Sequence, residues 1–274
     1  MDAKNARRGL AVLLGWAAGA APLHANEAID SVNNQESLAG GIAPLHASEV
    51  AASAGGAPGV DTASGTRFVF GYEAARTRTL LGIPDLYTDF DLTLGVATLR
   101  YAGLDSAPPA GAGQPLNQAA TYVEEELRLR LGKSFALFPA RRWALTPFVG
   151  ISQKAWARDA TATGSATFYD QGGAEAGVLA QASLPGQFVL GVDAAVGRVL
   201  AAVITDGAGN QVTAKAVSYA LHLDHRTFPD WHQRLELRQG TLRYAPAAGS
   251  GVFEPQRTSG LTILFSVGGE VSVL

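Results

Sequence analysis

Apolar and polar residues alternate with a period of two along most of the chain after residue 66. Successive side chains of a β-strand face opposite sides, so this period indicates strands. Between residues 121 and 131, Leu127, Leu129 and Leu131 share one face with Glu125. Leucines spaced by two would scatter around a helix instead of forming a stripe. The pattern predicts nine strands, over residues 67–78, 86–101, 120–131, 143–157, 172–184, 187–204, 211–226, 231–244 and 258–268.

Periodicity alone leaves two all-β architectures open. In a soluble sandwich or barrel the apolar face forms the core and the polar face meets water. In a membrane barrel the apolar face meets lipid and the polar face lines the interior.

Three features favour the membrane barrel. The predicted strands are 11 to 18 residues long, whereas soluble strands usually have about 5–6 residues and a membrane span needs about 9–11. Long connections such as 102–118, 158–171 and 245–256 alternate with short ones at 185–186 and 228–231, as in membrane barrels. Aromatic residues near strand ends suggest interfacial girdles: Tyr101, Trp143, Trp156, Phe188, Trp231 and Tyr244.

The first 65 residues differ from the rest. Lys4, Arg7 and Arg8 precede a 13-residue apolar run over residues 9–21, and Ala25 offers a small residue for cleavage. This pattern predicts a signal peptide over residues 1–25, since the run is shorter than the ~20 residues of a membrane-spanning helix.

Residues 26–65 are rich in Ala, Ser and Gly and predict a flexible, low-complexity leader before a barrel over residues 66–274. A weak strand within 46–62 stays open. Because a bacterial barrel has an even number of strands, the ring is predicted to have eight strands, or ten if the leader supplies one.

Composition excludes several classes of function. Charged residues make up 16% of the chain, below the ~25% of ordinary soluble domains. A net charge of −3 predicts no nucleic-acid partner. The chain has no Cys, which excludes disulfides, thiolate metal sites and Cys nucleophiles. We predict no cofactor.

Two segments resemble a known family. Leu145-Thr-Pro-Phe-Val-Gly, which continues to Trp-Ala-Arg-Asp159, and Phe253-Glu-Pro-Gln-Arg-Thr, which leads into Leu261–Phe265, are similar to strands of small proteobacterial outer-membrane β-barrel proteins of the OmpA membrane-domain and OmpX-like type. The resemblance implies a porin-like Gram-negative barrel in the cell outer membrane, in contact with outer-membrane lipid and inserted by the barrel insertion machinery. Those proteins commonly end in an aromatic residue, whereas this sequence ends in Leu274.

In such a barrel the polar strand faces point into the lumen. The charged residues predicted to form a lumen-facing network are Asp89, Asp91, Glu124, Glu126, Arg128, Arg130, Arg234, Glu236 and Arg238. Both signs occur on one face, so ion pairs can fill a narrow barrel. An eight-stranded ring has room for side chains but not for a channel. A plugged interior is therefore the main prediction, and a narrow polar pore or a small-ligand cavity is the alternative.

No motif predicts catalysis or metal binding. Ser218 and His222 share a strand face, but at ~3.3 Å per residue they lie about 13 Å apart, too far for a nucleophile and its base. We therefore expect a monomeric, non-enzymatic barrel with a structural or surface-interaction role through its extracellular loops, toward a partner that the sequence does not identify. The alternatives are a barrel enzyme acting on lipid or peptide, and a soluble periplasmic barrel that binds an apolar ligand.

Overall fold

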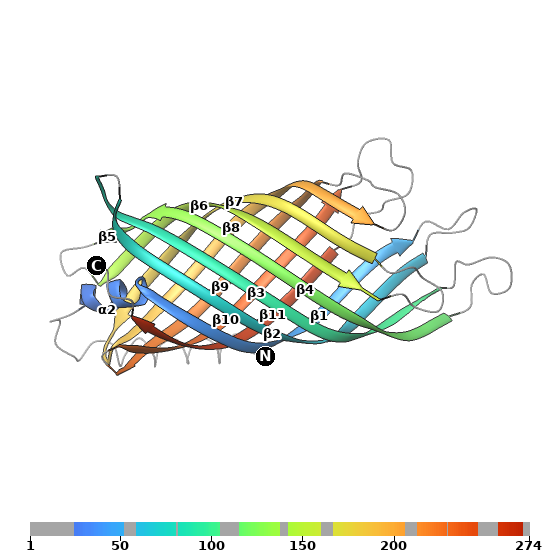
Figure 1. Ribbon diagram of the computed structural model, residues 1–274, viewed down its shortest axis with the longest axis horizontal. Helices are drawn as coiled ribbons and strands as arrows, with labels where there is room; N and C mark the ends of the chain where they lie inside the picture. The colour runs from blue at the N-terminus through green and yellow to red at the C-terminus, as the bar shows by residue number, and fades with distance from the viewer. Residues whose placement is uncertain are drawn as a thin grey trace, which may run out of the picture.

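A computed structural model describes residues 25–51, 59–80, 82–104, 115–137, 142–159, 167–205, 213–228, 230–245 and 257–270. These residues form one closed antiparallel β-barrel with a short helix at one end (Figure 1). The elements are α2 (Ala25–Val32), β1 (Gln35–Ala51), β2 (Gly59–Leu80), β3 (Ile83–Leu104), β4 (Pro115–Lys133), β5 (Phe135–Leu137), β6 (Trp143–Arg158), β7 (Thr167–Leu184), β8 (Phe188–Thr205), β9 (Thr213–Phe228), β10 (Trp231–Ala245) and β11 (Arg257–Glu270).

The ring follows the order of the sequence. Each long strand pairs with the next one, β4 pairs with β6, and β11 returns to pair with β1. Ten strands therefore close the barrel, while the three-residue β5 pairs only with β6, outside the ring. This up-and-down topology and all nine predicted strands are confirmed. Six of them lie within three residues of their expected limits, whereas β4 and β7 begin five residues earlier than predicted and β2 begins eight residues earlier.

The two ends of the barrel differ in their connections. Short connections lead from Leu80 to Ile83, from Leu184 to Phe188 and from Phe228 to Trp231 at the end where α2 lies, which we call the short-turn end (Figure 1). Gly186 has a φ of 76° in one of these turns, a conformation that glycine adopts without steric cost. The connections at the opposite, long-loop end join residues 51 to 59, 104 to 115, 158 to 167, 205 to 213 and 245 to 257.

The outward face of the barrel is apolar. Leu38 is 70% exposed, Phe70 61%, Val196 64% and Ile151 60%. Buried positions alternate with these along the same strands and are mostly polar, charged or small. Because a soluble barrel places its large apolar side chains inside, this distribution is that of a barrel surrounded by an apolar medium. No helix among the described residues is long and apolar enough to cross a membrane.

The expected leader over residues 26–65 is wrong. Its described part holds α2, β1 and the first residues of β2, so the ring has ten strands rather than eight. The alternation in β1 is faint because the outward positions whose side chains the structure describes carry only two large apolar residues, Leu38 and Ile42. A side chain at Gly41 would collide with Ile263 and Leu264. The glycine therefore leaves space for the side chain of Leu264, although its lack of a side chain weakens the alternation of apolar and polar residues in β1. The predicted signal peptide lies outside the described residues except for Ala25.

Candidate functional site in the barrel interior

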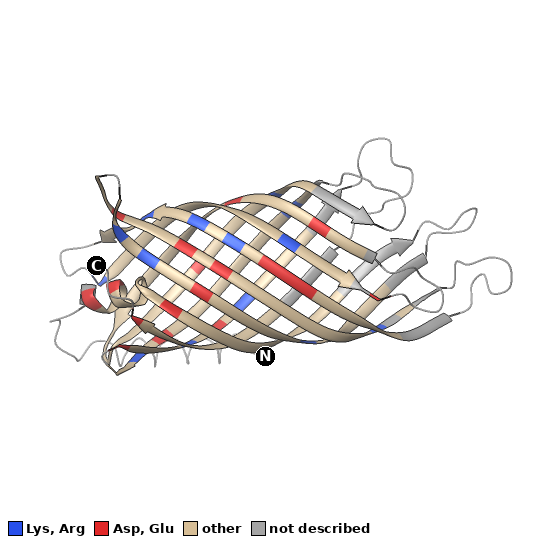
Figure 2. Ribbon diagram, in the orientation of Figure 1, with Lys and Arg blue, Asp and Glu red and all other residues tan. Residues whose placement is uncertain are grey.

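The interior contains the predicted charged residues, mostly in the half of the barrel nearer the short-turn end (Figure 2). Asp89, Asp91, Glu124, Arg128, Arg234 and Glu236 are buried, and Glu126, Arg130 and Arg238 are partly buried. All nine alternate with lipid-side positions such as Leu129 and Leu235, which are exposed. The charged side chains face inward because neighbouring side chains along a strand face opposite sides, so a strand whose apolar residues face outward turns its charged residues inward.

Asp91 joins strands from opposite parts of the ring. Its carboxylate accepts hydrogen bonds from Arg128 on the neighbouring β4 and from Arg238 on β10, the latter at 2.8 Å. Around the ring, β2, β1 and β11 lie between β3 and β10. A hydrogen bond between such distant strands crosses the lumen, so these side chains obstruct it.

Two further arginines also cross the interior. Arg130 on β4 donates to Glu175 on β7 at 2.7 Å and to Asp193 on β8 at 2.8 Å. Arg234 on β10 donates to Asp224 on β9 at 2.7 Å and to Glu73 on β2 at 2.6 Å. We call these residues the ion-pair layer. It comprises Asp91 with Arg128 and Arg238, Arg130 with Glu175 and Asp193, and Arg234 with Glu73 and Asp224.

A second charge cluster lies on the long-loop side of Asp91. Glu124 on β4 accepts hydrogen bonds from Arg67 on β2 and from Tyr122, and its carboxylate lies 3.1 Å from Lys154 Nζ on β6. Two cations beside one buried carboxylate stabilise its charge. Glu126 lies 3.4 Å from the same lysine.

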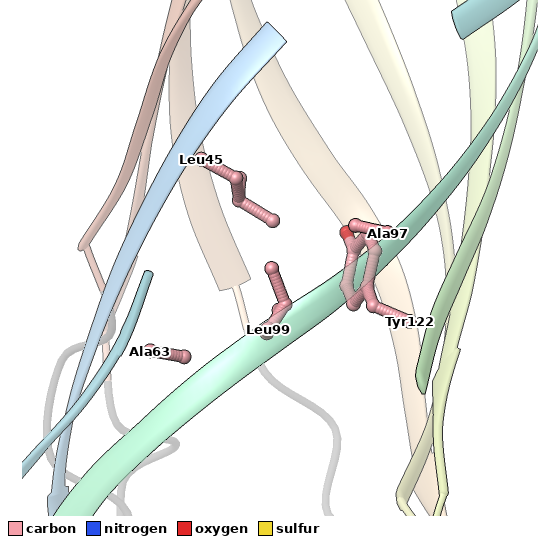
Figure 3. Packing of buried hydrophobic residues seen from close by; sticks show 5 residues of the cluster. All are labelled: Leu45, Ala63, Ala97, Leu99 and Tyr122. Carbon is pink, nitrogen blue, oxygen red and sulfur yellow. The ribbon is translucent and has the colours of Figure 1, made fainter. Parts of the chain in front are cut away.

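Beyond this cluster the interior becomes aromatic and apolar. A cavity of about 200 Å³ is bordered there by Leu45, Leu99, Tyr122, Trp156 and Leu242, with the charged cluster also lining it. Figure 3 shows Leu45, Leu99 and Tyr122 projecting from the wall into this space. We call it the upper cavity.

The wall of the upper cavity holds three neighbouring rings. Trp156 stacks on Tyr169 with ring centroids 3.9 Å apart, and it contacts Tyr122 at 5.5 Å on its other side. The prediction that Trp156 belongs to an interfacial girdle is wrong, because this residue is in phase with the inward side of β6. Trp143 and Trp231, in contrast, are 50% and 56% exposed.

Helix α2 closes the short-turn end. Ile29 and Val32 are buried against Ala144 of β6 and Val189 of β8. Asn33 and Gln181 of β7 exchange two amide hydrogen bonds of 2.9 and 2.8 Å. The backbone N–H of Thr77 on β2 donates to Asn34 Oδ1 at 3.0 Å. We call residues 25–34 the plug.

A serine, a histidine and a glutamate meet where the plug touches β10 and β11. Ser31 Oγ lies 2.7 Å from His232 Nε2 and also bonds Glu270, while Glu270 Oε1 lies 3.3 Å from the same nitrogen. A catalytic relay needs the acid on the other ring nitrogen. That nitrogen, Nδ1, is buried and has no hydrogen-bond partner within the described structure. The arrangement therefore anchors the plug and does not form a nucleophile relay.

The other histidine site considered in the sequence also lacks a relay. His222 is buried, its Nε2 lies 3.9 Å from Asp224 Oδ2, and no hydrogen bond joins it to Ser218 in the described structure. His225 stacks on Phe188 with centroids 4.2 Å apart. The described residues contain no group of three or more His, Cys, Asp or Glu side chains placed to hold a metal ion.

The sequence did not predict five of the interior charge partners. They are Arg67, Glu73, Lys154, Glu175 and Asp193. Each of the five lies in a predicted strand, in phase with the inward positions of that strand. The period of two therefore indicates that these side chains face the interior, but it does not indicate which residues they pair with.

Comparison with known proteins shows the fold class alone. No family model matches the sequence, and no curated protein matches it. The translocator domain of the autotransporter NalP from Neisseria meningitidis is similar in structure, with 12% identity, a TM-score of 0.42, and coverage of 98% of this chain and 96% of that one. The β domain of the Bordetella autotransporter BrkA has 13% identity, a TM-score of 0.39, and coverage of 84% and 98%. Neisserial surface protein A has 10% identity, a TM-score of 0.35, and coverage of 86% and 97%. The narrower likeness to OmpA- and OmpX-like barrels stays a prediction.

Proposed function

We propose that this chain is an integral outer-membrane β-barrel that does not conduct and acts at the cell surface. The observation that carries the proposal is the ion-pair layer, in which Arg238, Arg130 and Arg234 each bind carboxylates on strands that are not their neighbours. Because these side chains pair across the lumen, they narrow it at that level, and we expect no open aqueous path there. The apolar outward face supports the membrane location, since such a surface is costly in water and suited to lipid.

The plug supports the same proposal from the short-turn end. It contacts β7 and β8 and is hydrogen-bonded to β2, β7 and β10. Membrane barrels have short periplasmic turns and longer extracellular loops. In that orientation the plug faces the periplasm, while the upper cavity and the long loops face the exterior. A surface-interaction role through those loops follows, and catalysis is not part of the proposal.

The first experiment is fractionation followed by gel migration of boiled and unboiled samples. Recovery in the outer membrane with heat-modifiable mobility is expected for a closed membrane barrel. Recovery as a soluble periplasmic protein without that shift would overturn the membrane assignment and favour the soluble ligand-binding barrel.

The second experiment measures conductance of the refolded barrel in planar bilayers. We expect no stable current steps from the wild-type protein. An open-channel conductance at neutral pH would contradict the closed interior. An Arg130→Ala/Arg234→Ala/Arg238→Ala variant, which removes three side chains from the ion-pair layer, tests whether that layer is the obstruction.

The upper cavity favours a second candidate function, the binding of a small molecule with a flat apolar part. Tyr122 and Trp156 give its wall apolar ring surface, and the cluster of Arg67, Glu124 and Lys154 offers polar groups at its base. Titration of Trp156 fluorescence with small aromatic acids and amines tests this candidate, with Trp156→Leu as the control for signal from the other tryptophans.

A further inference from the structure

Two cationic side chains at the base of the upper cavity have unused hydrogen-bond donors. Lys154 Nζ carries three N–H groups, and within the described structure it contacts two carboxylates, Glu124 at 3.1 Å and Glu126 at 3.4 Å. Arg238 donates to carboxylates from Nε and Nη2, at 2.7 and 2.8 Å, and its Nη1 has no hydrogen bond to any described residue. Both side chains border the cavity and are partly exposed, by 24% and 19%. A molecule in the cavity can therefore reach free N–H donors.

The carboxylates that border the same cavity are already paired with cations. Each of the three described ones has at least one cationic partner within 3.5 Å: Glu124 has Arg67 and Lys154, Glu126 has Lys154 and Arg128, and Glu175 has Arg130. The cavity thus has spare donors but no spare carboxylate among its described residues. This favours a ligand that brings an acceptor, and an anionic acceptor makes the strongest hydrogen bonds with cations.

The space beside these donors is open and continues into an apolar wall. Gly240 of β10 lies on the inward face between Arg238 and Leu242, and a Cβ added there would have no atom within 4 Å. Leu45 and Leu99 project into the cavity beyond the charged residues (Figure 3). The cavity of about 200 Å³ therefore has hydrogen-bond donors at its base and apolar side chains farther from it.

We propose that the upper cavity binds a small monocarboxylate with one compact apolar group. The carboxylate accepts hydrogen bonds from the free donors of Lys154 and Arg238, and the apolar group lies against Leu45, Leu99 and Leu242. An ionised carboxylate is costly to bury unless it is paired and hydrogen-bonded, and these donors meet that requirement. An amine of the same size finds no free carboxylate. This inference deepens the second candidate function and rests on it, since it requires that the upper cavity bind a small molecule.

The test compares three ligands that share one ring and differ in the polar group. Benzoate, benzyl alcohol and benzylammonium are titrated by calorimetry into the refolded full chain in nonionic detergent micelles near neutral pH. We expect the wild type to bind benzoate about tenfold more tightly than benzyl alcohol, because a hydrogen bond between charged groups contributes more than one to a neutral group. Benzylammonium is expected to bind most weakly.

Lys154→Gln tests the donors at the base of the cavity. This substitution removes one cation, so we expect benzoate affinity to fall about tenfold and the preference for benzoate over benzyl alcohol to be largely lost. Lys215→Gln is the matched control, because Lys215 is exposed on the outward side of β9 and does not border the cavity. It is expected to bind benzoate within about twofold of the wild type, since an exposed outward charge contributes little.

Gly240→Leu tests the location of the site. A leucine side chain at this position fills the open space next to Arg238, so we expect binding of both benzoate and benzyl alcohol to be lost. Gly240→Ala adds a single methyl group and is expected to retain both. Heat-modifiable mobility of every variant checks that each has folded.

The possible results separate the inference from the function on which it rests. Equal affinity of the wild type for benzoate and benzyl alcohol, or tighter binding of benzylammonium, would overturn the preference for a carboxylate but leave a binding cavity. Benzoate affinity that is unchanged in Lys154→Gln would also overturn it. Binding that persists in Gly240→Leu would place the ligand outside the upper cavity and reject the site. Absence of binding of all three ligands to the folded wild type would contradict the second candidate function itself.

Discussion

Arg238 of β10 donates a hydrogen bond from Nη2 to Asp91 Oδ2 of β3 at 2.8 Å, across the lumen between strands that are separated by three others. The same guanidinium also binds Glu236 on its own strand through Nε at 2.7 Å. Asp91 accepts in addition from Arg128. This carboxylate therefore holds together side chains of three strands, and its removal is the most direct test of the closed interior.

Asp91→Ala is expected to destabilise the barrel by about 3 kcal/mol, because it leaves buried guanidinium charge without its main acceptor. The loss falls at the low end of the range for broken buried pairs, since Glu126 and Glu236 still face Arg128 and Arg238. The free energy of unfolding in phosphatidylcholine vesicles measures the effect. Asp170→Asn is the control, because among the described residues the Asp170 carboxylate accepts one hydrogen bond, from the neutral amide of Gln153 at 3.2 Å. This substitution should cost less than about 1 kcal/mol, and equal costs would contradict the role of Asp91.

Leu129→Arg tests which side of β4 faces lipid. Leu129 is 43% exposed, and its register partners, Phe90 and Ile151, provide no carboxylate. An arginine on the lipid face is expected to cost about 2–4 kcal/mol near the bilayer midplane. Unfolding in vesicles measures the cost, and Leu129→Phe is the control. If both substitutions are equally harmless, Leu129 does not contact hydrocarbon.

Ile29→Asp is expected to release the plug while the barrel stays folded. Ile29 is 2% exposed against Ala144 and Val189, and a carboxylate buried there without a partner costs about 2 kcal/mol or more. Hydrogen exchange of residues 25–34 should accelerate at least roughly 30-fold by the same figure, with unchanged exchange in the strands. Glu27→Gln is the control, because Glu27 is exposed and its ion pair with Arg226 spans 3.8 Å. Exchange that stays slow in Ile29→Asp would show that hydrogen bonds alone hold the plug.

Gly191→Ala is expected to cost about 1–3 kcal/mol by overpacking. A Cβ at this position would overlap the imidazole of His222, which is buried on the neighbouring β9. A second substitution, His222→Ala, should recover most of that cost, so a double-mutant cycle should show coupling between the two sites. Gly240→Ala is the control because no atom lies within 4 Å of its added Cβ. Additive effects of Gly191→Ala and His222→Ala would mean that the imidazole of His222 does not limit the space available at position 191.

Much of the fold was predictable because a strand repeats every two residues. The alternation around Leu127, Leu129 and Leu131 assigned β4 and its two faces correctly, and the same period located eight other strands. It failed at β1, where Gly40, Gly41 and Pro44 interrupt the apolar positions. Strand β1 is stabilised by pairing on both edges, with β2 and β11. The local sequence of a strand does not indicate which distant strands will pair with it to close the ring.

The sequence predicted which side chains face the barrel interior but not which of them contact one another. The sequence by itself determined which residues share a strand face, because the phase of a strand is local. Tertiary structure alone decided the number of strands, the insertion of α2 and the choice of partners. Arg238 and Asp91 are 147 residues apart and Arg234 and Glu73 are 161 apart. Such pairs exist only once ten strands have closed, because the curvature of the ring sets which inward side chains reach one another.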